Sequence, residues 1–216
     1  MGKYLTQMET QFIHGSVNLS HANAIMDLGS EAGRFSQVST HKEATAVSLD
    51  IDPYGLKKLH FKTKQVNVVQ ADARKIPLKD ETFDIIFMIE TLDYIPELNE
   101  ALAEIHRTLK PEASLFLSFG NKSSLKSKLR ELRGKSYTHS YRNVIHSLLK
   151  TGFTVKRKMG YSWLPFGRKS QNRLVPLLAS GERIFALMRI PSLSPWIIVH
   201  AIKLCSGVNG EEKKQK

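Results

Sequence analysis

Short apolar runs alternate with longer amphipathic segments along the first 120 residues. Residues 98–109 carry Leu, Ala and Ile at helical spacing, and Lys110–Pro111 ends this segment. The apolar runs have five to seven residues and little alternation, which is typical of strands buried on both faces of a parallel sheet. They cover residues 24–28, 46–50, 66–70, 83–89 and 114–119.

The rest of the pattern completes an α/β sheet. Two more strands are predicted at residues 153–159 and 196–203. Short connections between strands and helices favour a doubly wound, mostly parallel seven-stranded sheet. The other predicted helices cover residues 33–42, 54–60 after Pro53, 122–133 and 141–150, the last closed by Gly152.

The pattern also divides the chain into parts. An N-terminal arm with a weak helix is expected to pack through Met8, Phe12 and Ile13. The predicted parts are the arm at 1–22, the core at 23–162, a cap-like helical insertion between strands six and seven at 163–192, the final strand at 193–208 and a disordered tail at 209–216.

Composition narrows the class of protein. A chain of 216 residues with 41% hydrophobic residues suits one globular domain. No apolar run approaches the roughly 18 residues of a transmembrane helix, and the polar N-terminus is unlike a signal peptide. The single Cys205 excludes an internal disulfide and a cysteine metal cluster. We therefore expect a cytoplasmic protein with no metal site.

The excess of positive charge is concentrated in one block. The net charge is +12, and residues 121–169 hold 13 of the 32 basic residues but one of the 20 acidic residues. Within this block, residues 122–133 place Leu125, Leu129 and Leu132 on one helical face. This asymmetry indicates an anionic partner such as a membrane surface, a phosphorylated substrate or nucleic acid, or else a solvated basic face.

A glycine turn follows the first strand, in the stretch Ala24–Ser36 (AIMDLGSEAGRFS). A strand, a tight turn and a helix N-terminus bring backbone N–H groups close to an anionic ligand. The G-x-G-x-x-G fingerprint of dinucleotide sites is absent, since its register falls on Gly29, Glu31 and Arg34. Asp27 before the turn favours a ligand with a positively charged end instead.

Two more carboxylates follow neighbouring strands. Asp50 ends the second strand about 20 residues after the turn, where a carboxylate accepts both hydroxyls of a ribose. Asp72 follows the third strand, within reach of an adenine amino group. Each acid alone would also suit a helix cap, but three in register favour a ligand crevice at the carboxyl ends of the strands.

Four motifs in order resemble those of class I S-adenosylmethionine-dependent methyltransferases, closest to the ubiquinone and menaquinone biosynthesis type. They are residues 25–35, SLDIDP at 48–53, QADARKIP at 70–77 and residues 83–111. The resemblance covers residues 25–118 and implies the Rossmann-like methyltransferase fold with S-adenosylmethionine as cofactor. It implies cofactor contacts by Asp27, Gly29, Ser30, Gly33, Asp50, Ile51, Asp72, Ala73 and Ile89.

This sequence departs from the family pattern at three places. Glu31 stands where the family has a glycine, and a non-glycine residue with positive φ costs on the order of 1 kcal/mol. Tyr94 stands where a histidine is frequent, and Glu112–Ala113 replaces a Gly-Gly turn before the fifth strand. The first departure predicts weakened cofactor binding or a reshaped turn.

The sequence leaves the acceptor and its activation open. His139, Tyr141 and Tyr94 are the candidates for a catalytic base, and each is equally a packing or solvated residue. The apolar and basic insertion suits a small-molecule, lipid-linked or glycan acceptor, with peripheral contact of residues 121–169 to an anionic membrane. The alternatives are an RNA methyltransferase or RNA-binding protein, for which few aromatics accompany the charges, and a non-catalytic scaffold impaired at Glu31.

Overall fold

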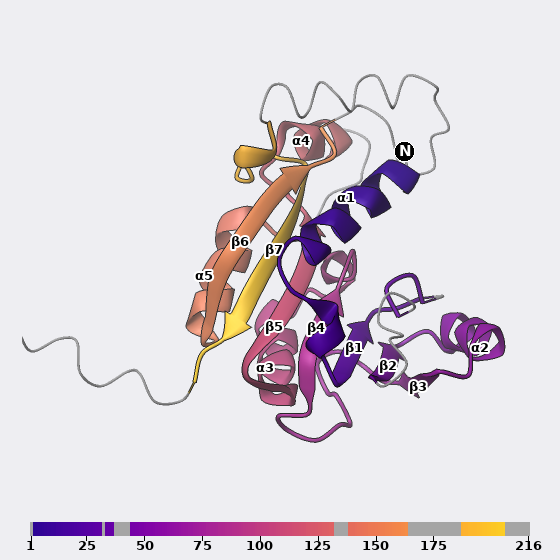
Figure 1. Cartoon of the computed structure of the whole chain (residues 1–216). Helices are drawn as coiled ribbons and strands as arrows, with labels where there is room; N and C mark the ends of the chain where they lie inside the picture. The colour runs from indigo at the N-terminus through magenta and orange to yellow at the C-terminus, as the bar shows by residue number, and fades with distance from the viewer. Residues whose placement is uncertain (1, 32, 37–43, 132–137, 164–186, 206–216) are drawn as a thin grey trace, which may run out of the picture.

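A single seven-stranded sheet forms the centre of the molecule in this computed structural model (Figure 1). The structure describes residues 2–31, 33–36, 44–131, 138–163 and 187–205. The strand order is β3-β2-β1-β4-β5-β7-β6, with β7 antiparallel to both of its neighbours. The doubly wound, mostly parallel sheet predicted from the sequence is therefore confirmed. The strands are β1 (Ala24–Leu28), β2 (Thr45–Asp50), β3 (Val66–Gln70), β4 (Phe83–Met88), β5 (Leu109–Gly120), β6 (Phe153–Tyr161) and β7 (Trp196–Lys203).

The helices begin and end close to the predicted limits where the sequence carries clear signals. Pro53 occupies the first turn of its helix, and Asp52 caps that helix by accepting from the Tyr54 N–H at 3.0 Å. Gly152 has φ 95° and ends another helix. The helices are α1 (Gly2–His14), α2 (Pro53–Lys62), α3 (Leu98–Thr108), α4 (Leu125–Glu131) and α5 (Tyr141–Lys150), with short 3₁₀ turns η1 (Leu19–His21), η2 (Leu92–Tyr94) and η3 (Leu187–Arg189).

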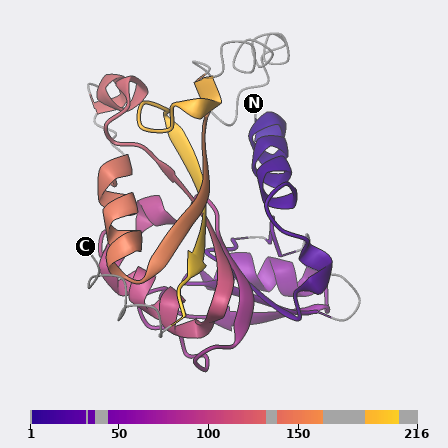
Figure 2. The ribbon, with the colours of Figure 1, turned by 60° about the vertical axis from the view of Figure 1, so that its left-hand side comes forward.

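Two hydrophobic cores lie on opposite faces of the sheet. Side chains of α3 and α5 join one core with Met26, Ile86 and Leu115 from the sheet. Side chains of α1 join the other core with the alternate strand residues, such as Ile25 and Phe87. Figure 2 shows α1 on one side of the sheet and α3 with α5 on the other. The predicted packing of Met8, Phe12 and Ile13 is confirmed, since all three are buried.

The structure corrects three predicted elements. Residues Gly33–Ser36 form turns instead of the start of a helix, because Gly33 has φ 78°, and the remainder of that prediction lies outside the described residues. β5 begins at Leu109, so the predicted loop at Pro111 belongs to the strand, with Glu112 at φ 60°. α4 begins at Leu125, three residues later than predicted.

Several predicted features fall outside the described residues. These are most of the insertion at 163–192, the Leu132 end of the basic helix and the tail after residue 205. The part of the insertion that is described contains η3 and leads into β7.

Candidate functional site

The carboxyl ends of β3, β2, β1 and β4 lie next to one another in the sheet. The sequence-predicted cofactor residues are carried by these ends and by the segments that follow them. Asp27 lies one residue before the end of β1, Asp50 ends β2, and Asp72 follows β3. The register aligns Asp27 with Ser48 and Asp50 with Gln70, so the three acids occupy neighbouring strands near one edge. This edge is where open α/β sheets bind ligands.

The turn after β1 depends on Gly29. Its φ is 74°, and a Cβ there would lie 2.1 Å from the Thr91 side chain. The Thr91 hydroxyl donates to the Leu28 carbonyl at 3.1 Å, and the Gly29 N–H donates to the Leu49 carbonyl at 2.7 Å. Only glycine fits at position 29, because Thr91 in the segment after β4 lies against the backbone there. This contact holds the turn in place at the edge of the sheet.

The second half of the turn is held by α2. A Cβ on Gly33 would lie 2.3 Å from Leu59, and a Cβ on Gly55 would lie 2.7 Å from the Glu31 carbonyl oxygen. The first turn of α2 thus packs directly on the backbone of the glycine turn. A displacement of either segment would move the other.

Asp27 is buried beneath the turn. The Ser36 hydroxyl lies 2.6 Å from its Oδ2 and 2.5 Å from the Ser48 hydroxyl. Burial raises the pKa of Asp27 to about 6, partly offset by hydrogen bonds from Ser36 and by the charge of Arg34. The sequence predicted that this carboxylate lines the ligand crevice beside Asp50 and Asp72, but the structure buries it beneath the turn. Its charge state therefore depends on the low dielectric of the protein interior.

The Asp50 carboxylate at this edge has hydrogen-bond acceptor positions that the protein does not fill. Its Oδ2 accepts the Glu31 N–H at 2.7 Å, and its Oδ1 accepts the Asp52 N–H at 2.9 Å. A carboxylate has about four acceptor positions, so two remain for the hydroxyls of a ribose. The adjacent Ile51 is 67% exposed, which leaves its side chain available as an apolar surface for an adenine ring.

Asp72 is already occupied by a neighbouring cation. The Arg74 guanidinium donates to its Oδ2 at 2.6 Å and 3.1 Å and to its Oδ1 at 3.0 Å, and the Arg74 N–H donates to Oδ1 at 2.9 Å. These bonds lower the pKa of Asp72. Arg74 also pairs with Glu97 at 2.9 Å. An adenine amino group can reach the Asp72 carboxylate only if Arg74 gives way, whereas the neighbouring Ala73 backbone is not subject to that competition.

Ser30 and Ile89 complete the predicted set. The Ser30 hydroxyl is buried in the turn and has no hydrogen-bond partner among the residues that the structure describes. Such an orphaned polar atom calls for a ligand or water. Ile89 is buried directly after β4, with the Glu90 N–H donating to the Ser118 hydroxyl at 2.9 Å. The orphaned Ser30 hydroxyl and the spare positions on Asp50 fit a ligand with carboxylate and ribose groups.

Glu31 has the positive φ that was expected at this position of the turn. Its φ is 48°, in the left-handed region that favours glycine, and its side chain is exposed. The turn keeps its shape around Glu31 because the Glu31 N–H is bonded to Asp50. The strained backbone of Glu31 is therefore stabilised by a hydrogen bond to Asp50, a residue of the predicted cofactor site.

A buried charged network beside the turn was missed at the sequence level. Glu9 of α1 is fully buried and accepts from the Tyr161 hydroxyl at 2.8 Å. Arg34 lies 3.4 Å from Glu9 and 3.3 Å from Glu90. Burial raises the pKa of Glu9 to about 7, against the opposing charge of Arg34. A signal was available, because Glu9 shares a helical face with Leu5, Phe12 and Ile13.

Two of the three candidate bases, Tyr94 and His139, lie on segments that contact each other, because the Thr138 hydroxyl donates to the Asp93 carbonyl at 2.7 Å. Tyr94 is 85% exposed. His139 is buried and its Nε2 lies 2.7 Å from the Ile95 carbonyl oxygen, a structural contact. The Tyr141 hydroxyl accepts from Lys158 at 2.8 Å. None of them is placed beside the glycine turn by a described contact.

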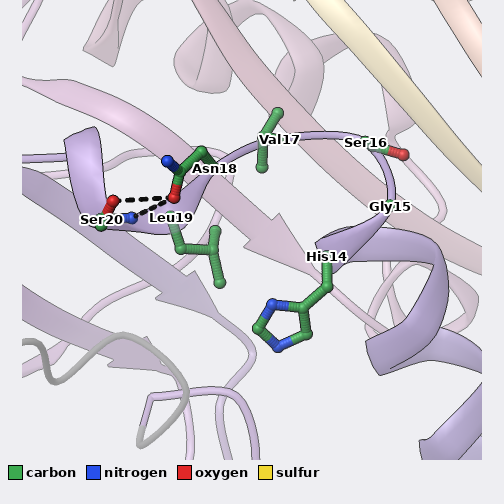
Figure 3. Close-up of a pocket in the computed structure, with 7 residues that line it drawn as sticks. All are labelled: His14, Gly15, Ser16, Val17, Asn18, Leu19 and Ser20. Atoms are coloured by element: carbon green, nitrogen blue, oxygen red, sulfur yellow. Dashed lines mark hydrogen bonds between the residues drawn. The ribbon is translucent and has the colours of Figure 1, made fainter.

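Two open hollows lie along the N-terminal arm. One is lined by residues 14–20 where α1 leads into η1, and Figure 3 shows His14 and Leu19 beside it, with Asn18 accepting from Ser20. The other lies between the outer face of α1 and Arg34. Among the described residues, no group of three His, Cys, Asp or Glu side chains is arranged to hold a metal ion. No helix in the described ranges is long and apolar enough to span a bilayer.

Comparison with protein families identifies the segment that carries this site. Residues 26–117 match the family described as "Methyltransferase domain". The match begins in β1 and ends in β5, so it contains all the predicted cofactor residues of the sheet edge.

Curated relatives share this part of the chain. The chain is 32% identical over 120 residues to a methyltransferase, phqN, of Penicillium fellutanum, covering 52% of this chain and 36% of the relative. It is 26% identical over 124 residues to 24-methylenesterol C-methyltransferase 2 of Arabidopsis thaliana, covering 54% and 34%. It is 25% identical over 183 residues to a ubiquinone biosynthesis O-methyltransferase of Pseudomonas fluorescens, covering 74% and 77%. The chain therefore spans about a third of the length of the first two.

Solved structures share the fold over most of the chain. A structure described as a putative sarcosine dimethylglycine methyltransferase from Galdieria sulphuraria has a TM-score of 0.70 at 14% identity, covering 93% of this chain and 86% of that one. An S-adenosylmethionine-dependent methyltransferase from Mesorhizobium loti has a TM-score of 0.69 at 16% identity, covering 90% and 97%. The Rossmann-like methyltransferase fold expected from the sequence motifs is thus confirmed.

Proposed function

We propose that this chain, which contains a class I S-adenosylmethionine-dependent methyltransferase domain, transfers a methyl group from S-adenosylmethionine to a small apolar or lipid-linked acceptor. The observation that carries the proposal is the edge formed by β1, β2 and β3. It combines a glycine turn, an orphaned Ser30 hydroxyl and a carboxylate, Asp50, with two acceptor positions free.

The roles proposed for the site residues come from the family resemblance, and the places of these residues at the carboxyl ends of the strands support them. Asp27 would face the cofactor amino group through water, and the turn of Gly29, Ser30 and Gly33 would hold its methionine carboxylate. When bound, S-adenosylmethionine supplies an electrophilic methyl group on a sulfonium, leaving S-adenosylhomocysteine after transfer. The protein positions the two reactants and excludes water. Asp50 would accept hydrogen bonds from the ribose hydroxyls, and Ile51 would pack on adenine. The Ala73 backbone would meet the adenine edge, joined by the Asp72 carboxylate only once Arg74 has moved away from it. Ile89 would lie near the methionine part.

The class of acceptor is inferred from the relatives and from this chain's surface. Two of the relatives are named for a sterol and for ubiquinone biosynthesis, and both kinds of molecule are apolar. In this chain two large apolar side chains that follow the carboxyl ends of neighbouring strands are exposed, Tyr94 in η2 after β4 and Leu125 in α4 after β5. These two facts support an apolar acceptor over a glycan.

Calorimetry with S-adenosylhomocysteine tests the cofactor part of the proposal. The wild type is expected to bind, and Asp50→Ala is expected to lose roughly tenfold or more of the affinity, since charge-assisted hydrogen bonds contribute about 1.5–3 kcal/mol. Glu112→Ala is the matched control, because it removes an exposed acid at the amino end of β5. Absence of binding by the wild type at high micromolar ligand would contradict the proposal.

One observation favours a second candidate function, a non-catalytic scaffold. Glu31 has φ 48° where the family has glycine, and its exposed carboxylate adjoins the place where a cofactor carboxylate would lie. The same titration separates the two candidates. Wild type without affinity, restored by Glu31→Gly, would favour the scaffold. If tritiated methyl groups pass from labelled cofactor into an organic extract of lipids, the transferase is supported.

A further inference from the structure

Five large apolar side chains are exposed around the carboxyl end of β5. Two belong to α4 and two to the segment that leads into β7, while the fifth belongs to η2. Leu125 is 73% exposed and Leu193 is 59% exposed. The set is Tyr94, Leu125, Leu129, Ile190 and Leu193.

Hydrogen bonds tie these segments to one place. The Asn121 side chain donates to the carbonyls of Ser192 at 2.9 Å and Ser194 at 3.1 Å. The Gly120 N–H donates to the Asp93 carboxylate at 3.2 Å. Figures 1 and 2 both show α4 and η3 at the same end of the molecule. The five side chains therefore surround one end of the sheet, which we call the β5 end.

The polarity of α4 is the reverse of that of an ordinary surface helix. Ser127 of α4 is buried, and so is Ser124, which directly precedes the helix. Its outer side presents Leu125 and Leu129, four residues apart on one helical face. A helix of a soluble protein normally buries its apolar face. The reversal indicates that the outer face meets an apolar medium.

The exposed charges beside α4 and η3 are basic, whereas η2 contributes the half-buried Asp93, whose carboxylate accepts the Gly120 N–H. Lys122, Lys128 and Arg189 are exposed around the apolar side chains. The sequence of residues 121–131 has four Lys or Arg and one Glu. Leucines flanked by lysines are the composition of a segment that lies in a bilayer interface and is attracted to anionic lipids. A nucleic-acid surface would carry several aromatic side chains among the charges for base stacking, whereas Tyr94 is the one aromatic side chain in this set.

We propose that the β5 end docks on an anionic phospholipid surface and takes the methyl acceptor from the bilayer. The acceptor half of this statement rests on the proposed function, whereas the docking half does not. α4 directly follows β5, so docking places the bilayer at the same edge of the sheet as the glycine turn. An apolar acceptor could then reach the site without crossing water.

Vesicle co-sedimentation tests the docking surface. Vesicles of phosphatidylcholine with about one third phosphatidylglycerol are compared with pure phosphatidylcholine at low salt. The wild type is expected to bind the anionic vesicles, and Leu125→Ser/Leu129→Ser is expected to lose roughly tenfold or more of that binding. Leu149→Ser is the matched control, since Leu149 is 57% exposed, as is Leu129, but lies at the far end of α5. All the substituted side chains are exposed, so thermal unfolding should stay unchanged.

Each outcome decides the matter. The proposal is overturned if the wild type ignores anionic vesicles, binds neutral vesicles equally well, or loses as much binding through Leu149→Ser as through the paired α4 change. It is also overturned if light scattering shows a dimer that Leu125→Ser/Leu129→Ser dissociates, because the face would then be a contact between copies of this chain. Binding of tRNA that vesicles do not compete would assign the face to nucleic acid instead. Vesicle binding by a protein without affinity for S-adenosylhomocysteine would uphold docking and refute the proposed function.

Discussion

At the scale of single residues, burial controls the charge of Asp27. Its carboxylate lies beneath the turn with Ser36 as hydrogen-bond donor, and its pKa is raised to about 6. A cofactor ammonium group needs the ionised carboxylate, while burial favours the neutral form. The affinity for the cofactor should therefore depend on pH near neutrality.

We expect S-adenosylhomocysteine to bind about tenfold more weakly at pH 5 than at pH 7, because one unit below the pKa about nine tenths of the carboxyls are protonated. Above pH 7 the Asp27 carboxylate adds no further pH dependence, because it is already ionised. Calorimetry across this range measures the dependence. Asp27→Asn should bind weakly at every pH with no step, and a step of unchanged size in that variant would assign the dependence to another group.

Strain at Glu31 gives a prediction with an internal control. Glu31 and Glu112 both have positive φ, 48° and 60°, and both are exposed. Glu31→Gly and Glu112→Gly should each change the free energy of unfolding by about 1 kcal/mol or less, since relief of strain is opposed by the flexibility of glycine. Only Glu31→Gly should strengthen S-adenosylhomocysteine binding, because Glu112 lies at the opposite edge of the sheet. Equal affinities in both variants would show that the Glu31 carboxylate does not face the ligand.

At the scale of elements, the strands were predictable because their burial on two faces leaves continuous apolar runs. β7 matches its predicted limits, and β3 does as well. The helix expected after the turn failed at its first residues, because the positive φ of Gly33 is incompatible with a helix start. Pro111 suggested a loop, yet it lies in β5 where the pairing with β4 is irregular, and its missing N–H is tolerated there.

The candidate site was predictable only in part. The places of Asp50 and Asp72 follow from strand order, which sequence motifs specify. Competition from Arg74 and the burial of Asp27 depend on side-chain directions, which no sequence spacing determines. Glu9 and Tyr161 are 152 residues apart, so only the folded chain brings them together.

The contact between α2 and the glycine turn makes Gly55 a sensitive position. Gly55→Ala would place a Cβ 2.7 Å from the Glu31 carbonyl oxygen, a backbone atom that cannot move alone. We expect the variant to lose about 1–3 kcal/mol of unfolding free energy and to bind S-adenosylhomocysteine more weakly. Chemical denaturation and calorimetry measure the two effects. Gly15→Ala is the comparison, because a Cβ there meets the side chain of Arg157 at 3.0 Å and lies away from the turn. Unchanged affinity in Gly55→Ala would show that the turn is not held by α2.

At the scale of the whole molecule, one buried network joins three distant parts of the chain. Glu9 belongs to the arm, Arg34 to the glycine turn and Tyr161 to the end of β6. α1 contributes to the core on one face of the sheet through the same helical side. The arm therefore packs as part of the folded protein. The ionisation of its buried Glu9 carboxyl should change the free energy of unfolding of the whole protein.

The sign of that effect follows from proton binding. The pKa of Glu9 is about 7 in the folded protein and near 4.5 when exposed, so the folded state binds the proton more tightly. Stability from this group is present at low pH and is lost as pH rises to about 7. His106 and His200 act in the opposite direction, because burial lowers the pKa of both. The test must therefore compare variants rather than read the wild-type curve alone.

The prediction concerns the free energy of unfolding of Glu9→Gln minus that of the wild type. We expect this difference to increase by on the order of 1–2 kcal/mol between pH 5.5 and pH 8. Urea denaturation at the two pH values measures the difference, and the histidine contributions cancel because both proteins share them. Glu90→Gln removes the other carboxylate beside Arg34 and should keep the wild-type dependence on pH. If the free energies of unfolding of Glu9→Gln and the wild type changed equally with pH, Glu9 would be charged in the folded protein. Only a carboxyl that burial keeps neutral makes the wild type less stable over this pH range.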